Sequence, residues 1–414
     1  MSLGGRLGAV RNLVVANGVT SFGAGVTEFA LPLVALTLLD ASASEVALLY
    51  AVSLAARAVV SLPVGVWVDR TDRARAAVLG LVAGGLVVLA VPALTAGGVL
   101  SMGWLVAVAV GAGVTSTVVQ VAAQALVPAL VDGRQLLSAN AGLTFGRSLG
   151  TMVGPGAGGI VVGWIGAGFA LLVDGVSQLL AALMLVRLRD PAPHREVVDR
   201  PRRAAWHGVQ AVLADPLLRR ILVGTTVFNV SGGLIGSLYF PYAYQDLGLS
   251  PIGLGVAAMV GNVGLLAGSA LAPRAVRRLG LTRAATLSDT IAVASFGLIL
   301  GASLLSPLAM LAVYEFLFGL AISVFRVSVA TLRQERTPGV LQGRVFSIVL
   351  LGPMFGAPVG AAVGAGLAVP FGVPGAIAVG VAVGVLSLAP FWLPGWRTEP
   401  EPEPAPDPAP DPAR

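Results

Sequence analysis

The chain has 414 residues, of which 56% are hydrophobic before its 54 glycines are counted, and only 11% are charged. An ordinary globular protein has about 25% charged residues, so this composition excludes a water-soluble surface over most of the chain. The basic residues number 26 and are all arginine, which excludes an ATP-binding P-loop because that motif requires a lysine. The absence of cysteine excludes disulfides and thiolate metal sites.

Apolar stretches long enough to cross a bilayer follow one another along the chain. A hydrocarbon core of about 30 Å needs roughly 20 mostly apolar residues in a helix. About twelve such stretches are separated by turn residues or arginines, and the sequence therefore predicts an all-α, multi-pass membrane protein. The predicted spans are Asn12–Leu39, Val46–Val68, Ala76–Ala96, Met102–Ala123, Leu137–Gly163, Ala167–Val186, Leu218–Tyr242, Gly253–Ala272, Thr282–Leu304, Leu308–Ala330, Gly343–Ala368 and Gly372–Leu393.

The arginines outside the spans all fall in alternate connections. Basic loops resist translocation and stay in the cytoplasm, so this alternation predicts that both chain ends are cytoplasmic. Three further arginines, Arg57, Arg147 and Arg326, fall inside predicted spans. The basic connections contain Arg6 and Arg11, Arg70 to Arg75, Arg134, Arg187 to Arg220, Arg274 to Arg283, and Arg333 to Arg344.

A polar segment divides the predicted spans into two sets of six. Residues 1–187 are expected to form an N-terminal six-helix bundle and residues 218–393 a C-terminal one. Residues 188–217 read as a cytoplasmic linker that ends in a short amphipathic helix around Trp206 to Leu213. The tail, residues 394–414, alternates proline with acidic residues and is expected to be disordered because it cannot bury a core.

The two halves share a weak internal repeat at an offset of 203 residues. Gly65 corresponds to Gly268, Arg75 to Arg278 and Pro155 to Pro358. Parallel repeats related by an axis along the membrane normal build many secondary transporters, whose substrate site lies near midplane between the repeats. The sequence therefore predicts two pseudo-symmetric bundles around a central cavity.

Polar side chains recur on every third predicted span. Asn17 and Glu28 in the first span are eleven residues apart, which places them within about 20° of one helical face. Such stripes are expected where spans one, four, seven and ten surround an aqueous cavity. The candidates for cavity and proton coupling are Asn17, Glu28, Arg57, Gln120, Gln124, Arg147, Asn229, Glu315 and Arg326.

Glu28 is the first candidate for a proton carrier. At about 1.5 Å per residue from Asn12 it lies in the outer half of the bilayer, and an ionisable group within a span indicates function by default. The alternative is a permanent ion pair with an arginine of a neighbouring helix, with Arg147 as the expected partner. Arg57 and Arg147 are candidates either for substrate or proton coupling or for ion pairs between helices. Glu315 is a second candidate for a proton carrier.

The connection after the second span resembles a known family signature. Gly65-Val66-Trp67-Val68-Asp69-Arg70-Thr71-Asp72-Arg73 is similar to the signature loop of the major facilitator superfamily. The resemblance implies that Asp69 and Arg73 belong to a cytoplasmic charge latch that favours an outward-facing state, with Gly65 and Arg70 as part of the gating loop. One departure is Asp72, where the pattern has glycine, which puts the tight turn in doubt.

The fifth span contains a glycine-rich run with a proline. Glycines four residues apart allow a neighbouring helix to approach closely, and a proline bends its helix. The run resembles the motif of proton-coupled antiporters within the same superfamily. The alternative is a generic packing seam, which is the reading preferred for the glycines from Gly352 to Gly364. The motif residues are Gly150, Gly154, Pro155, Gly158 and Gly159.

Further stretches resemble the drug exporter branch that includes macrolide efflux pumps and the enterobactin exporter. They include Phe29-Ala30-Leu31-Pro32-Leu33, Gln124-Ala125-Leu126-Val127-Pro128 and Leu137-Ser138-Ala139-Asn140. The resemblance implies multidrug-type efflux of a small amphipathic molecule, driven by the proton gradient across the inner or plasma membrane. A cavity with few charges favours uncharged or cationic substrates.

Two other functions stay open, a proton-coupled importer of a nutrient and a non-transporting membrane sensor. A membrane enzyme is disfavoured because the two histidines, His194 and His207, lie in the linker without ligand-like spacing. The expected partners are lipid, a small-molecule substrate and the proton gradient, with no cofactor, metal site or nucleic acid.

Overall fold

The computed structural model describes residues 3–131, 133–188, 190, 201–338, 341–393 and 396. Within these residues the regular structure is entirely helical, which confirms the predicted all-α class. Most of the proline-rich stretch of the linker, residues 191–200, and the tail, except Trp396, lie outside the described residues.

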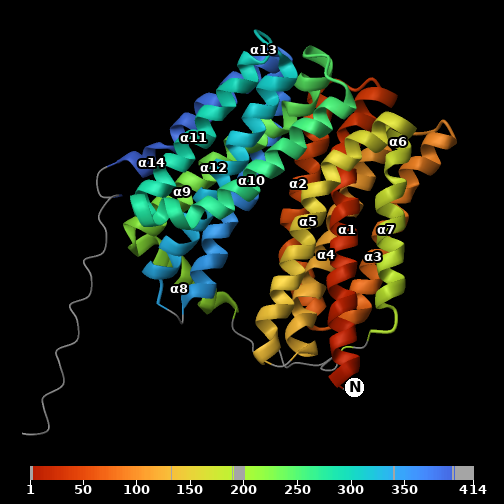
Figure 1. Ribbon diagram of the computed structural model, residues 1–414, viewed down its shortest axis with the longest axis vertical. Coiled ribbons are helices and arrows are strands. Elements are labelled where there is room, and N and C mark those ends of the chain that lie inside the picture. Colours follow the sequence, from red (N-terminus) through yellow and green to blue (C-terminus); the bar gives the residue numbers. More distant parts are fainter. Residues whose placement is uncertain are drawn as a thin grey trace, which may run out of the picture.

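The helices form two bundles in chain order (Figure 1). The first contains α1 (Leu3–Leu38), α2 (Ala43–Asp69), α3 (Arg73–Ala96), α4 (Met102–Leu130), α5 (Gly133–Ile165), α6 (Ala167–Ala170) and α7 (Leu172–Leu185). The short helix α8 (Pro201–Ala214) follows and covers the predicted amphipathic segment. The second contains α9 (Pro216–Pro241) with its π-helical extension η1 (Tyr242–Asp246), α10 (Pro251–Leu279), α11 (Leu281–Gly301), α12 (Pro307–Arg336), α13 (Gln342–Ser387) and α14 (Ala389–Trp392).

Local sequence signals set several helix starts. Ser42 and Glu45 form a reciprocal capping box at α2, and Ser250 caps α10 just before Pro251. A capping side chain satisfies backbone N–H groups that the first helical turn leaves without partners. The predicted helix ends were less accurate. Helices α4 and α10 continue past the predicted ends of their spans at Ala123 and Ala272.

Eleven helical segments within the described residues are long and apolar enough to cross a membrane. The last of them includes α13, which is two helices joined at Gly372, where φ is 67°. That left-handed conformation suits glycine, and it lies where the sequence predicts a boundary between two spans. The structure is therefore consistent with the expected twelve spans.

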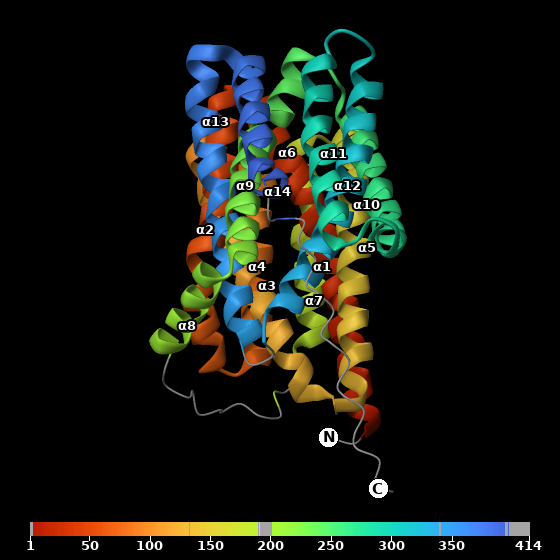
Figure 2. The same ribbon diagram turned by 90° about the vertical axis from the view of Figure 1, so that its left-hand side faces the viewer.

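The bundles touch at one end and separate at the other (Figure 1), and the N-terminus lies beyond the separated end (Figure 2). We call the separated end the basic face, because Arg70 after α2 and Arg336 at the end of α12 lie there, as does the start of α1. The other end is the opposite face. Here Ser44 Oγ donates a hydrogen bond to the Ala365 carbonyl at 2.8 Å, joining the two bundles.

Other contacts between the bundles also lie toward the opposite face. Asn262 Nδ2 of α10 donates to the Met152 carbonyl of α5 at 2.9 Å. The rings of Phe29 and Phe240 meet edge to face with centroids 5.4 Å apart. These contacts close the space between the bundles on this side.

Trp396 anchors the end of the described chain in the second bundle. Its side chain is fully buried and packs edge to face on Phe391, with centroids 4.9 Å apart. Its indole N–H donates to Thr286 Oγ1 at 2.8 Å and to the Thr282 carbonyl at 3.2 Å, both on α11. The indole therefore fixes the segment after α14 against the start of α11.

Trp396→Phe is expected to destabilise the full-length protein by about 1 to 3 kcal/mol, since it leaves the buried Thr286 hydroxyl oxygen without its donor. Denaturant unfolding in detergent micelles measures this free energy. The matched control is Trp104→Phe, because Trp104 is 51% exposed, and we expect a change within about 0.5 kcal/mol there. Equal effects of both substitutions would show that the Trp396 hydrogen bonds contribute nothing.

Candidate functional site

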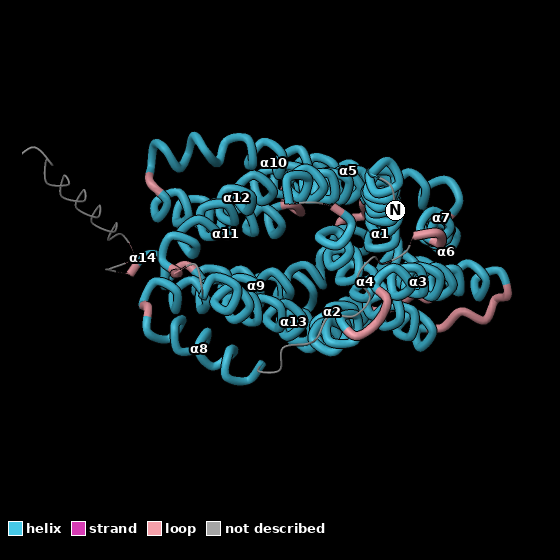
Figure 3. Tube along the Cα trace, turned by 90° about the horizontal axis from the view of Figure 1, so that it is seen from below, coloured by secondary structure: helices cyan, strands magenta, loops and turns pink. Residues whose placement is uncertain are grey.

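A cavity of ≈ 630 Å³ lies between the two bundles. Its walls come from α1, α2, α3, α4, α5 and α7 of the first bundle and from α9 and α13 of the second. Figure 3, seen from below, shows the helices of both bundles that surround this space. Along α1 the lining runs from Asn17 to Glu28, so the polar face expected for the first span does face the cavity.

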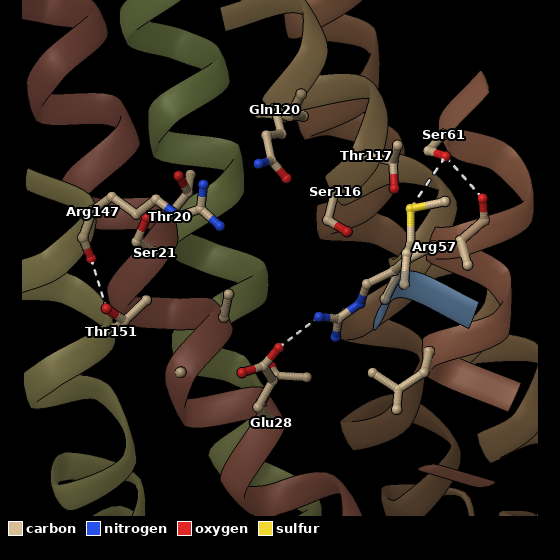
Figure 4. Close-up of a pocket in the computed structure, with 18 of the residues that line it drawn as sticks. Thr20, Ser21, Glu28, Arg57, Ser61, Ser116, Thr117, Gln120, Arg147 and Thr151 are labelled. Atoms are coloured by element: carbon tan, nitrogen blue, oxygen red, sulfur yellow. Dashed lines mark hydrogen bonds and ion pairs between the residues drawn. The ribbon is translucent and has the colours of Figure 1, made fainter. Parts of the chain in front are cut away.

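Glu28 forms an ion pair with Arg57 inside this cavity (Figure 4). Arg57 Nη1 donates to Glu28 Oε1 at 2.8 Å, joining α1 to α2. The side chain of Glu28 is 58% exposed and that of Arg57 is 45% exposed. A pair that stays this hydrated is held weakly and can open at small cost. The alternative considered for Glu28 was an ion pair with Arg147, and the structure pairs Glu28 with Arg57 instead.

Four other predicted residues also line the cavity: Asn17, Gln120, Arg147 and Asn229. Asn17 Nδ2 donates to the Leu143 carbonyl at 3.1 Å and so ties α1 to α5. Asn229 is the polar residue that the second bundle contributes, and its Nδ2 donates to the Thr225 carbonyl of its own helix at 2.8 Å.

Gln124, Glu315 and Arg326 lie outside the lining of this cavity. Glu315 faces α10 instead, where a Cβ added to Gly261 would meet its Oε2 at 2.7 Å. Span ten therefore does not supply the expected polar stripe. Helices α2, α3, α5, α7 and α13 contribute lining residues that the every-third-span pattern did not predict. Helical phase identifies a polar face, but the bundle packing decides what that face meets.

Asp174 of α7 also belongs to the cavity wall. It is 2% exposed. Thr27 Oγ1 donates to its Oδ2 at 2.7 Å and Gln178 Nε2 to its Oδ1 at 3.1 Å. The sequence did carry a signal for this site, because Asp174 and Gln178 are one helical turn apart.

The signature loop forms its turn without glycine at position 72. Asp72 is the N-cap of α3 and accepts a hydrogen bond from the Arg75 backbone N–H at 3.0 Å, with φ at −64°. Arg73 is buried, and its Nη1 lies 4.0 Å from Asp190 Oδ2. Asp69 is exposed and forms no ion pair with a described residue. The latch that the resemblance implied for Asp69 is therefore not closed in this conformation.

The glycine motif of α5 serves two different faces. A Cβ at Gly150 would meet the Phe22 backbone nitrogen of α1 at 2.6 Å, and one at Gly154 would meet Gly25 Cα at 2.8 Å. A Cβ at Gly158 would meet the side-chain Cβ of Phe29 of α1 at 3.2 Å. These glycines pack α5 on α1 inside the first bundle, and Pro155 lies among them within α5.

Gly159 points instead toward the second bundle. A Cβ there would meet the Pro251 carbonyl oxygen at 2.7 Å and Gly255 Cα at 2.8 Å, both of α10. The last glycine of the motif therefore lies in the seam that closes the opposite face.

The sequence matches the family model described as the Major Facilitator Superfamily over residues 13–288 and 221–413. None of the curated proteins matches the sequence significantly. Among solved structures, a bacterial homologue of the human lysosomal transporter Spinster, inward-facing and unoccupied, has a TM-score of 0.73 at 15% identity over 94% of this chain and 97% of that chain. The nucleoside transporter NupG has a TM-score of 0.71 at 11% identity, covering 92% of this chain and 97% of that one.

A third similar protein has been solved in two states. The inward-facing bacterial homologue of the iron transporter ferroportin has a TM-score of 0.73 at 16% identity, covering 94% of this chain and 98% of that chain. Its outward-facing state has a TM-score of 0.59 at 18% identity, covering 92% and 98%. At these identities the likeness establishes the fold.

Proposed function

The chain belongs to the Major Facilitator Superfamily, and from this premise we propose that it is a secondary transporter that uses the proton gradient to expel a small amphipathic molecule by alternating access. The observation that carries the proposal is the hydrated Glu28–Arg57 ion pair in a cavity enclosed by both bundles.

In this proposal the structure is the inward-facing state in the inner or plasma membrane. The arginine distribution places the basic face in the cytoplasm, and the bundles contact each other on the opposite face. The higher TM-score against the inward-facing state of the ferroportin homologue, 0.73 against 0.59, supports the same assignment.

Glu28 is the proposed proton carrier. When Glu28 is ionised, Arg57 holds it across the gap between α1 and α2. Protonation of Glu28 removes its charge and releases Arg57, so the two protonation states favour different contacts in the cavity. A ligand or proton shifts a conformational equilibrium only through such differential contacts.

Export is supported by the glycine motif of α5. Gly159 allows α5 and α10 to meet closely on the opposite face, and a tight seal there keeps protons and released substrate from leaking back through the resting protein. The resemblance of this motif to that of proton-coupled antiporters favours exchange over symport.

The test is growth of an efflux-deficient host that expresses the full chain under challenge with a panel of amphipathic compounds. We expect raised tolerance to at least one compound, and loss of that tolerance with an uncoupler. Purified protein in proteoliposomes should then move this compound against its gradient when a pH gradient is imposed. Uptake that the proton gradient drives in the same direction as the protons would overturn export, and tolerance that survives the uncoupler would overturn proton coupling.

A further inference from the structure

The charged side chains of the cavity are not all paired. Its ionisable lining residues are Glu28, Arg57, Arg147 and Asp174. Glu28 and Arg57 neutralise each other at 2.8 Å. Asp174 is 2% exposed, both of its carboxylate oxygens accept hydrogen bonds from the first bundle, and it forms no ion pair with Arg147. Arg147 remains as an unpaired cation.

The guanidinium of Arg147 has no acidic partner within 4.0 Å among the described residues. Its side chain extends from α5 toward Thr20 and Ser21 of α1 (Figure 4). Thr20 donates its own hydroxyl hydrogen to the Ala16 carbonyl at 2.9 Å. The Thr20 hydroxyl oxygen can therefore offer Arg147 only a neutral acceptor. The five N–H donors of a guanidinium in a fixed fork match the two oxygens of a carboxylate or phosphate.

Neutral donors also point into the same cavity. Ser21 and Gln120 both line it, and neither side chain donates a hydrogen bond to another described residue. A hydroxyl and an amide without internal partners are free to donate to an anion that Arg147 attracts. The polar groups available for a ligand are thus concentrated on the first bundle.

The second bundle gives the cavity an apolar wall. Apart from Asn229, its lining residues carry no polar side chain: Leu350, Pro353, Met354, Ala357 and Pro358. A molecule that binds Arg147 on the first bundle and packs on the apolar residues of the second has an anionic group on one side and an apolar body on the other. Low-dielectric walls around an unpaired cation further raise the local concentration of anions.

We infer that the substrate is an amphipathic oxyanion, whose carboxylate or phosphate binds Arg147 while its apolar body packs on α13. This inference rests on the proposed transport function and defines its substrate class. It replaces the expectation, drawn from the low overall charge, that uncharged or cationic molecules are preferred.

The sign of the cavity potential can be measured without knowing the substrate. The chain has no cysteine, so Ser116→Cys places a single thiol in the cavity wall. The full-length variant in nanodiscs is reacted with 2-sulfonatoethyl methanethiosulfonate, an anion, and with 2-trimethylammonioethyl methanethiosulfonate, a cation. The ratio of the two rates, divided by the same ratio for a free thiol in solution, cancels the reactivity of the thiol itself.

We expect this normalised ratio to exceed one and to fall about tenfold when Arg147→Gln is added, a change equivalent to about 1.4 kcal/mol. The matched control is Arg277→Gln, which removes the same charge from an exposed position at the end of α10 and should leave the ratio within about twofold. A ratio below one, or one that Arg147→Gln does not change, overturns the inference.

Binding of a matched probe set then separates the ligand classes. The probes are 2-naphthoate, 2-naphthyl phosphate, 2-naphthalenemethanol and (2-naphthylmethyl)ammonium, which share one apolar body. Arg147→Gln should weaken the anions about tenfold or more, change the alcohol by less than about twofold, and not weaken the ammonium. An equal loss for all four contradicts the inference. Neither experiment needs a proton gradient, so a failure of proton-coupled transport leaves these results intact, and the reverse also holds.

Discussion

Glu28→Gln is expected to abolish proton-driven accumulation of any compound that the wild-type protein expels, while the protein still folds and inserts. Glutamine keeps the size and hydrogen-bonding capacity of the side chain but cannot carry the proton. The flux driven by a pH gradient in proteoliposomes should fall at least about a hundredfold, as expected when a required protonation is removed. Exchange of labelled for unlabelled compound at equal concentration, without a gradient, should persist because it requires only binding and rocking of the bundles.

The control for this result is Glu45→Gln. Glu45 caps α2 at the exposed opposite face and lies outside the cavity lining. Its substitution should leave proton-driven flux within about twofold, since a lost cap costs only about 1 kcal/mol of stability. If Glu28→Gln retained the wild-type response to a pH gradient, Glu28 would have no part in coupling.

The second large effect is expected at Gly159, where Gly159→Ala should open the seam between the bundles. The added methyl would lie 2.7 Å from the Pro251 carbonyl and 2.8 Å from Gly255 Cα, and both are backbone atoms that cannot yield locally. The strain is relieved when α5 and α10 separate, so the equilibrium shifts toward a state that is open on the opposite face. We expect cross-linking of Ser44→Cys with Ala365→Cys to slow by about tenfold, equivalent to about 1.4 kcal/mol.

Two glycines of the same helix serve as controls for this shift. Gly163→Ala meets only side-chain carbons of Ile252, which can rotate, so cross-linking should stay near the wild-type rate. Gly150→Ala meets the α1 backbone within the first bundle, so it should lower thermal stability without a selective effect on the seam. Cross-linking that is equally fast in the Gly159 and Gly163 variants would show that the seam does not hold this conformation.

Much of the fold follows from the sequence because hydrophobic length and arginine placement are local properties. The long spans and the boundary at Gly372 needed no tertiary information. Helix ends were less accurate where polar and charged residues continue a helix beyond its apolar stretch, as α10 does up to Leu279.

The candidate site was only partly predictable, for a physical reason. The face shared by Asn17 and Glu28 follows from helical periodicity within one helix, and both residues line the cavity. The partner of Glu28 depends on how α2 and α5 pack around α1, and no local pattern distinguishes Arg57 from Arg147. Glu315 has the same kind of polar spacing but faces α10, because Gly261 leaves room for its carboxylate.

The two-sided role of the α5 motif was also hidden in the sequence. Its spacing indicates close helix packing but does not say which glycines meet α1 and which meet α10. The structure separates Gly150 and Gly154 from Gly159 on this basis. The same run of residues therefore packs α5 on α1 inside the first bundle and closes the contact with α10 of the second bundle.

The central claim, that the bundles must separate on the opposite face during each transport cycle, has a direct test. Ser44 and Ala365 are joined by a 2.8 Å hydrogen bond across that face, and cysteines at these two positions can be bridged by a short, reducible bifunctional thiol reagent. We expect bridging to stop transport in proteoliposomes and a reducing agent to restore it. Transport by the bridged protein at the rate of the reduced protein would contradict alternating access through this cavity.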